Sequence, residues 1–120
     1  MAKDDYDVIV YRILVYLYAV LKQKIMFENL TFQKAVRKNV ESDEYFTEIL
    51  KMMQEEGLIN GLVFAKAWGG IVLLASDISD AKITVAGIHY LNENSRMKQI
   101  GTMLKESVDL IAKLAVLAIS

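Results

Sequence analysis

The pattern of apolar residues changes at Gly57, and this change limits the folds that the chain can adopt. Before Gly57, residues 43–56 carry one stripe at the spacing i, i+3, i+4 and i+7, formed by Phe46, Ile49, Leu50 and Met53. After Gly57, residues 58–66 and 71–75 are typical of extended strands. The paired glycines of Ala67-Trp68-Gly69-Gly70 accept positive φ, so this segment predicts the turn of a hairpin.

Capping signals place helices on both sides of the hairpin. Asp4 or Asp5 can cap the first helix, with its carboxylate at the positive end of the macrodipole. Ser42, Thr84 and Ser95 can cap three later ones. The predicted helices cover about 5–24, 31–38, 43–56, 84–93 and 96–118. The expected fold is mostly α with a small β-hairpin (α+β), a winged helix-turn-helix with an additional C-terminal helix.

No feature divides the chain into separate units. Its 120 residues contain no proline, no repeat and no Gly/Ser-rich linker. We therefore expect one winged-helix-like domain over residues 1–120.

We expect no secretory signal peptide at the N-terminus. Acidic residues follow Met1 where a secretory signal would carry positive charge. The apolar run 8–21 has 14 residues, whereas a bilayer-spanning helix needs about 20. Together with the absence of cysteine, this favours a cytoplasmic protein without a membrane segment.

Several short segments follow one another in a specific order. These segments are Met1 to Tyr6 with Val8 to Tyr11, Glu44 to Phe46, Glu55 to Ile59, Ala67 to Gly70, Ile83-Thr84, Gly87-Ile88, Tyr90-Leu91 and Glu93 to Ser95. In these segments and their order the chain resembles the YjcQ family. The resemblance implies a small phage- or prophage-associated protein with a winged-helix-like fold. It supplies no catalytic residues.

Residues with catalytic or metal-binding chemistry are few and scattered. His89 is the only histidine, and without cysteine it cannot complete a common zinc site. Asp77 and Asp80 match no calcium loop, so capping or solubility is the more frequent role of such residues. Gly69-Gly70 lacks the context of a phosphate loop. We expect no enzyme, and no catalytic, cofactor-binding or metal-binding residues.

Charge weakens the usual function of a winged helix. The third helix, which normally enters the major groove of DNA, has five acidic residues and one lysine over 43–56. The candidate nucleic-acid contacts are therefore Lys34, Arg37, Lys38, Lys66 and Trp68. Solvated surface charge is the alternative interpretation of the basic residues. Trp68 can project from the hairpin tip to stack on a partner, or fold back onto the domain.

The last predicted helix is more apolar than one face of a small domain requires. Its candidate dimer or partner interface comprises Ile100, Met103, Leu104, Ile111, Leu114 and Leu117. A homodimer through the first and last helices would cover these residues. The alternative is that the last helix folds against the first within a monomer.

Two functional hypotheses follow from the sequence. The first is a non-enzymatic phage- or prophage-associated winged-helix protein that acts by binding, as a homodimer, with duplex DNA as a candidate ligand. The second is a protein-interaction or structural phage component that uses this fold as a scaffold.

Overall fold

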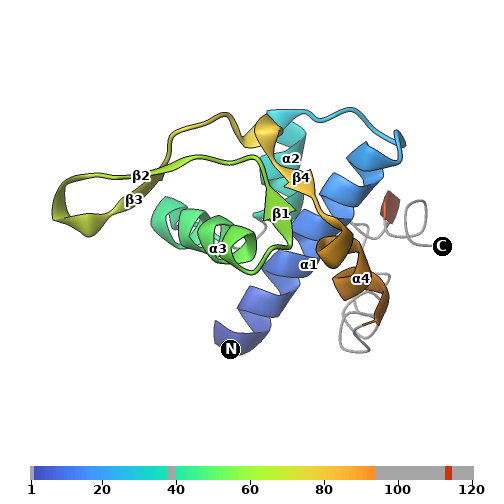
Figure 1. Cartoon of the computed structure of the whole chain (residues 1–120), viewed down its shortest axis with the longest axis horizontal. Helices are drawn as coiled ribbons and strands as arrows, with labels where there is room; N and C mark the ends of the chain where they lie inside the picture. Colours follow the sequence, from blue (N-terminus) through green and yellow to red (C-terminus); the bar gives the residue numbers. More distant parts are fainter. Residues whose placement is uncertain (1, 38–39, 94–112, 115–120) are drawn as a thin grey trace.

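The computed structural model describes residues 2–37, 40–93 and 113–114 (Figure 1). These ranges contain four α-helices and two pairs of short antiparallel strands, which confirms the predicted mostly α class with a small hairpin. The helices are α1 (Ala2–Leu21), α2 (Asn29–Val36), α3 (Asp43–Glu55) and α4 (Val85–Glu93). The strands are β1 (Ile59–Asn60), β2 (Phe64–Lys66), β3 (Val72–Leu74) and β4 (Lys82–Ile83). This order is compatible with a winged helix-turn-helix, and that finer assignment stays a prediction.

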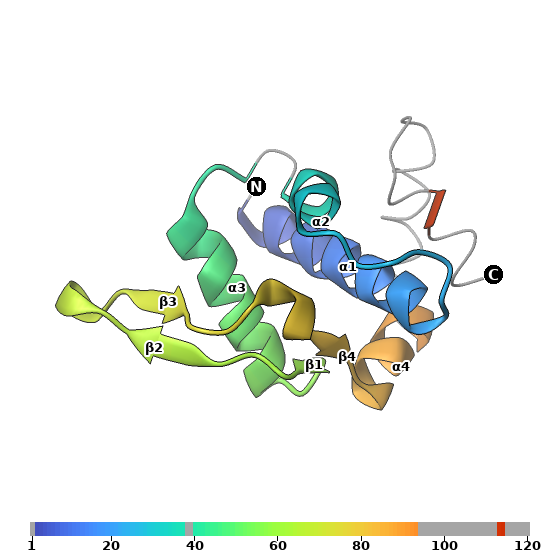
Figure 2. The same cartoon turned by 90° about the horizontal axis from the view of Figure 1, so that it is seen from above.

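The other elements pack around α1. Its residues from Ile9 to Leu17 are all buried, so this stretch has no solvent-facing side. The elements α2, α3, α4 and β4 all contact α1, and Figures 1 and 2 show them around it. A helix that is apolar nearly all round must be covered all round, because exposing apolar surface costs about 25 cal/mol per Å². The prediction that the first helix is covered on both sides is confirmed.

One charged residue, Arg12, lies within this buried stretch of α1. Its Nη1 donates a hydrogen bond to the carbonyl oxygen of Ala35 at 2.9 Å. Ala35 is in the last turn of α2, where carbonyl groups have no partner within the helix and the macrodipole favours a cation. Arg12 therefore fixes the C-terminal end of α2 against α1.

Four aromatic rings fill the space between α1, α2 and α3. Tyr16 of α1 meets the rings of Phe27 and Phe32 edge-on, at centroid distances of 5.6 and 5.1 Å. Phe46 of α3 continues the cluster at 6.3 Å from Phe32. Such tilted arrangements stabilise a core beyond the area that they bury. The aromatic cluster thus connects three helices that are separate in the sequence.

Side-chain caps account for the starts of α3 and α4. The Oγ of Ser42 accepts a hydrogen bond from the N–H of Tyr45 at 3.1 Å. The Oγ1 of Thr84 accepts one from the N–H of Gly87 at 3.0 Å. Each hydroxyl satisfies a backbone donor that has no partner inside the helix. The predicted N-caps Ser42 and Thr84 are confirmed, and the third, Ser95, lies outside the described residues.

The first helix is shifted toward the N-terminus relative to the predicted range 5–24. It starts at Ala2, so Asp4 and Asp5 lie in its first turn instead of at the N-cap. It ends at Leu21, because Gln23 adopts a left-handed conformation with a φ of 61°.

The second helix is also shifted, and covers Asn29–Val36 instead of 31–38. Glu28 occupies the N-cap position, and the Thr31 hydroxyl donates a hydrogen bond to the Glu28 carboxylate. The helix therefore begins two residues before Thr31.

The hairpin is longer than predicted, and its ladder is interrupted. The strands β2 and β3 pair near the tip, and β1 pairs with β4 at the base. Between the two ladders, three residues (61–63) face seven (75–81), so the returning arm has four more residues. The predicted strand 58–66 is therefore broken at 61–63. The sequence interpretation missed β4, because a strand of two residues shows no alternation.

Gly61 stands at the start of this interruption and only glycine fits there. Its φ is 96°, and a Cβ at this position would lie 2.3 Å from the carbonyl oxygen of Asp80. The close approach of the two arms thus depends on the absence of a side chain.

Most of the predicted helix 96–118 lies outside the described residues. The exceptions are Lys113 and Leu114, both of which are helical. Among the described helices, none combines the length and the hydropathy of a bilayer-spanning segment.

The helix α4 lies close to the base of the hairpin because Gly87 has no side chain. An added Cβ would lie 2.4 Å from the carbonyl oxygen of Leu58 and 2.8 Å from Cγ1 of Ile83. The Leu58 carbonyl also accepts a hydrogen bond from the N–H of Thr84 at 3.1 Å. That carbonyl cannot move away without losing the bond.

We predict that Gly87→Ala lowers the free energy of unfolding by about 1–3 kcal/mol, as at other overpacked sites. Without the close contact, alanine would stabilise the helix by about 1 kcal/mol relative to glycine. A decrease in the free energy of unfolding therefore indicates that the close contact exists. Urea unfolding of both proteins measures the difference. A variant more stable than the parent protein would contradict this packing.

Two buried tyrosines predict the behaviour of the fold in alkali. Burial raises the pKa of Tyr11 and Tyr16 above the ordinary value of 10.0, and in Tyr16 a hydrogen bond to the backbone of Glu28 partly opposes this shift. The stabilisation is complete below pH 10.0 and is lost as the pH rises through the folded-state pKa. Urea midpoints should therefore fall above about pH 10, and less steeply in Tyr11→Phe and Tyr16→Phe variants. Identical slopes in these variants would exclude the two phenols as the cause.

Candidate binding surface

Six residues of the hairpin lie on one face, because side chains alternate between the two faces along each strand. Ala65 and Leu73 are partners in the ladder, and two hydrogen-bonded pairs, Val63 with Ala75 and Ala67 with Ile71, continue its register by one step at each end. The N–H of Ala75 donates to the carbonyl oxygen of Val63 at 2.8 Å, and the N–H of Ala67 donates to that of Ile71 at 2.7 Å. These two bonds close the ladder at both ends. We call these six residues the outer face.

The opposite face of the hairpin packs against the body of the protein. Phe64 and Leu74, which are partners across the ladder, are half-buried against the core. The strand β3 contacts α3, and both views show the hairpin beside this helix (Figures 1 and 2). The inner face therefore anchors the hairpin and leaves the outer face available.

The outer face is uncharged and open to solvent. Val63 is 58% exposed, Leu73 is 51% exposed and Ile71 is 38% exposed, and Ala65 and Ala75 are exposed as well. An antiparallel sheet with one solvated face normally carries polar residues on that face. A contiguous apolar patch in their place is typical of an interaction surface.

Trp68, at the tip of the hairpin, is a further exposed apolar residue. It is 96% exposed, so its ring projects from the domain and does not fold back onto it. Gly69 and Gly70 follow with φ angles of 79° and 80°, which form the tight turn. Figure 1 shows the tip at the end of the molecule away from α4. A fully solvated tryptophan is unusual, because this residue normally buries most of its ring.

The exposed side of α3 is acidic. The five acidic residues of 43–56 are all exposed: Asp43, Glu44, Glu48, Glu55 and Glu56. The one lysine of this range, Lys51, pairs with Glu55 at 2.9 Å, and this hydrogen-bonded carboxylate raises the pKa of Lys51. The negative charge of this side also acts on α1. Burial is the largest cause that raises the pKa of Tyr6, and the charge of Glu56 is the next. This side of α3 would repel a phosphate backbone.

The structure places the four predicted basic contacts in different situations. Lys34 on α2 and Lys66 on β2 are exposed, whereas Lys38 lies outside the described residues. Figure 2 shows α3 between α2 and the hairpin. Lys34 and Lys66 are therefore on elements that flank an acidic helix and do not form one basic patch.

Arg37, the fourth basic candidate, is engaged within the domain. Its Nη1 lies 2.7 Å from Oδ1 of Asp43, and its guanidinium carbon lies 5.0 Å from the centroid of the Phe46 ring. Nη2 donates a hydrogen bond to the carbonyl oxygen of Glu41 at 3.3 Å. Only 21% of the side chain is exposed. Arg37 thus connects the end of α2 to the start of α3.

The residues considered for metal or acid–base chemistry have structural positions. The carboxylate of Asp77 accepts hydrogen bonds from N–H and Oγ of Ser79 at 2.9 and 2.8 Å, and these bonds lower the pKa of Asp77. It caps the short turn Ile78–Asp80, in agreement with the predicted capping role. His89 is exposed on α4. In the described ranges, no three His, Cys, Asp or Glu residues are grouped so that they could hold a metal ion.

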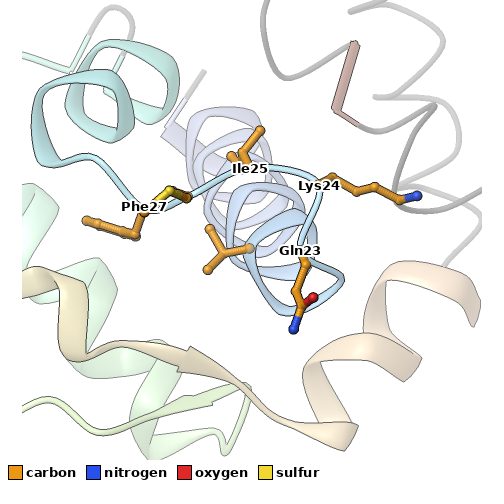
Figure 3. A pocket seen from close by; sticks show the side chains of 6 residues that line it. Gln23, Lys24, Ile25 and Phe27 are labelled. Atoms are coloured by element: carbon orange, nitrogen blue, oxygen red, sulfur yellow. The ribbon is translucent and has the colours of Figure 1, made fainter.

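A shallow hollow of about 620 Å³ lies at the connection between α1 and α2 (Figure 3). It is lined by Val20, Gln23, Lys24, Ile25, Met26 and Phe27. Figure 3 shows the Lys24 side chain pointing away from the Phe27 ring. Because the lining has no acid–base pair, we assign no chemistry to this hollow.

The predicted dimer interface is described at one position only. Leu114 is 2% exposed and belongs to the core of the single chain, so its burial requires no second copy. The other interface candidates lie outside the described residues: Ile100, Met103, Leu104, Ile111 and Leu117. The homodimer through the first and last helices stays a prediction.

Sequence reasoning selected Trp68 and Lys66 but missed the outer face. The sequence did contain a signal for this face. Every second residue from Val63 to Ala67 and from Ile71 to Ala75 is apolar. Three of the residues between them, Phe64, Val72 and Leu74, are apolar as well. A strand that is apolar on both faces needs a cover on each.

We predict that Arg37→Ala lowers the free energy of unfolding by about 1–2 kcal/mol, since it removes an ion pair and a cation–π contact. Lys34→Ala, which removes an exposed charge from the same helix, should stay within about 0.5 kcal/mol of the parent protein. Urea unfolding measures both. Equal stability of the two variants would refute the structural role of Arg37.

Comparison with known proteins identifies the family of the chain. A family model described as YjcQ protein matches residues 11–110, which is 100 of the 120 residues. No curated protein and no solved structure matches the chain. The matched range includes α2, α3, the whole hairpin and α4. The chain therefore belongs to the YjcQ family.

Proposed function

We propose that this protein is a non-enzymatic binding module, and that the outer face and Trp68 form its contact surface for another polypeptide. The observation that carries the proposal is the exposure of uncharged apolar side chains on the outer face, together with Trp68 at the tip, on a projecting hairpin. The phage or prophage setting and the cytoplasmic location expected from the sequence are part of the same proposal.

The energetic argument rests mainly on the tryptophan. A Trp side chain contributes roughly 200 Å² of surface to a contact, and covering it releases on the order of 5 kcal/mol before the losses of association. Trp is also the type of residue that most often dominates protein interfaces. At 96% exposure, Trp68 offers nearly its whole ring to a partner.

Duplex DNA is the second candidate, since Lys66 is exposed two residues before Trp68. The charges of the neighbouring elements oppose it. Nonspecific DNA affinity depends on the number of phosphates that cations neutralise. Arg37 is engaged with Asp43, and the exposed side of α3 is acidic. A polypeptide partner does not require a cluster of free cations, so we favour it.

Photo-crosslinking from the tip tests this proposal. A photo-activatable phenylalanine replaces Trp68, and a control variant carries it at Asn92, an exposed position on α4. After irradiation in cells, we expect protein adducts from position 68 that exceed those from position 92. Adducts composed mainly of nucleic acid, or equal yields at both positions, would count against the proposal.

A titration with mixed-sequence duplex DNA completes this test. At low salt we expect no binding tighter than about 10⁻⁴ M, the weak end of nonspecific association. Tighter binding that weakens with added salt, and is reduced by Lys34→Ala and Lys66→Ala, would favour the DNA alternative.

A further inference from the structure

We infer that the polypeptide on the outer face is a second copy of this chain, packed face to face about a two-fold axis parallel to the hairpin strands. The inference rests on the proposed function and names the partner of the same surface.

The first argument is the distribution of side-chain size on the outer face. Each of its three cross-strand pairs joins one large branched residue to one alanine: Val63 to Ala75, Leu73 to Ala65, and Ile71 to Ala67. Leu73 and Ile71 therefore form a ridge along one arm, and Ala65 and Ala67 leave a groove along the other. Near the base the order reverses, with Val63 opposite Ala75.

The second argument is geometric. Rotation by 180° about an axis parallel to the strands exchanges the two arms and preserves the level of each pair. It places Leu73 of one copy over Ala65 of the other, and likewise Ile71 over Ala67. At the base, Val63 lies over Ala75. All three levels thus combine a large residue with a small one, which is the condition for interdigitating layers.

The other in-plane axis gives a poorer fit. A two-fold axis perpendicular to the strands keeps each arm over its own copy and reverses the order of the levels. At the middle level, Leu73 then opposes Leu73 and Ala65 opposes Ala65, so that one large pair collides and one small pair leaves a gap. Complementarity therefore favours a single orientation, in which both hairpin tips point the same way and the two turns that carry Trp68 are at the same end of the dimer.

Charge does not oppose this contact. The outer face has no ionisable side chain, and Lys66 belongs to the opposite face by the alternation along β2. The acidic residues of α3 are on the helix that contacts the inner side of the hairpin. Two copies with a formal net charge of −1 each can approach through an uncharged surface.

The size of the surface predicts a reversible dimer. A standard interface buries about 800 Å² on each partner, and Trp68 alone supplies roughly a quarter of that. The remaining contribution comes from three half-exposed branched residues and three alanines. We expect a dissociation constant between about 1 μM and about 1 mM.

Sedimentation equilibrium of the full chain, over concentrations reaching about 1 mM, tests the inference. The parent protein should pass from monomer to dimer, and the emission of Trp68, the only tryptophan, should shift to the blue as dimer forms. Leu73→Lys should weaken dimerisation about tenfold or more, because it places an unpaired charge in the contact. Leu30→Lys, at an exposed apolar position on α2, is the matched control and should have no effect.

A residue exchange tests the register. Ala65→Leu places two leucines opposite each other at the middle level, and Leu73→Ala leaves two alanines there, so each should weaken the dimer. The double variant, Ala65→Leu with Leu73→Ala, exchanges the large and the small residue of this level and should restore dimerisation to within about threefold of the parent protein. Circular dichroism and urea midpoints confirm that each variant is folded.

Three results would overturn the inference. A chain that stays monomeric at about 1 mM excludes the dimer, although the proposed function survives if Trp68 still crosslinks to other proteins. A dimer that Leu73→Lys leaves intact uses another surface, such as the first and last helices. A double variant no better than its single variants excludes the ridge-and-groove register.

Discussion

Burial of α1 on every side is the constraint on which the rest of this fold depends. A chain of this size has one core, and α1 occupies its centre, so each of the elements α2, α3, α4 and β4 must present its apolar side to that helix. Arg12 positions α2 in this packing, because its hydrogen bond to the carbonyl oxygen of Ala35 holds the C-terminal end of α2 against α1. With the inner elements committed to α1, the hairpin is the part that extends away from the body.

The elements that could be predicted are those whose signals are local. Ser42 and Thr84 make their capping bonds with the residues three positions later, so the sequence around them contains the whole interaction. The interrupted ladder could not be predicted in the same way. The residues around Gly61 do not show that the carbonyl of Asp80 lies beside it, because that contact forms only when both arms have folded.

The candidate surface was predicted in part for the same reason. Trp68 stands out by residue type, but its exposure depends on how the other elements that the structure describes are arranged around the tip. Arg37 was read as a surface cation, whereas Asp43 and Phe46 from the next helix engage it. The outer face depends on the register of β2 and β3, since a shift of one residue would exchange it with the inner face.

The four extra residues between β3 and β4 separate the hairpin into two parts. They end one regular ladder before the other begins, so the distal arms share no continuous hydrogen-bond register with the base. A distortion of the distal arms, as on contact with a partner, is therefore not transmitted through the ladder to β1 and β4. The outer face can adapt to what it binds while the α1-centred body keeps its packing.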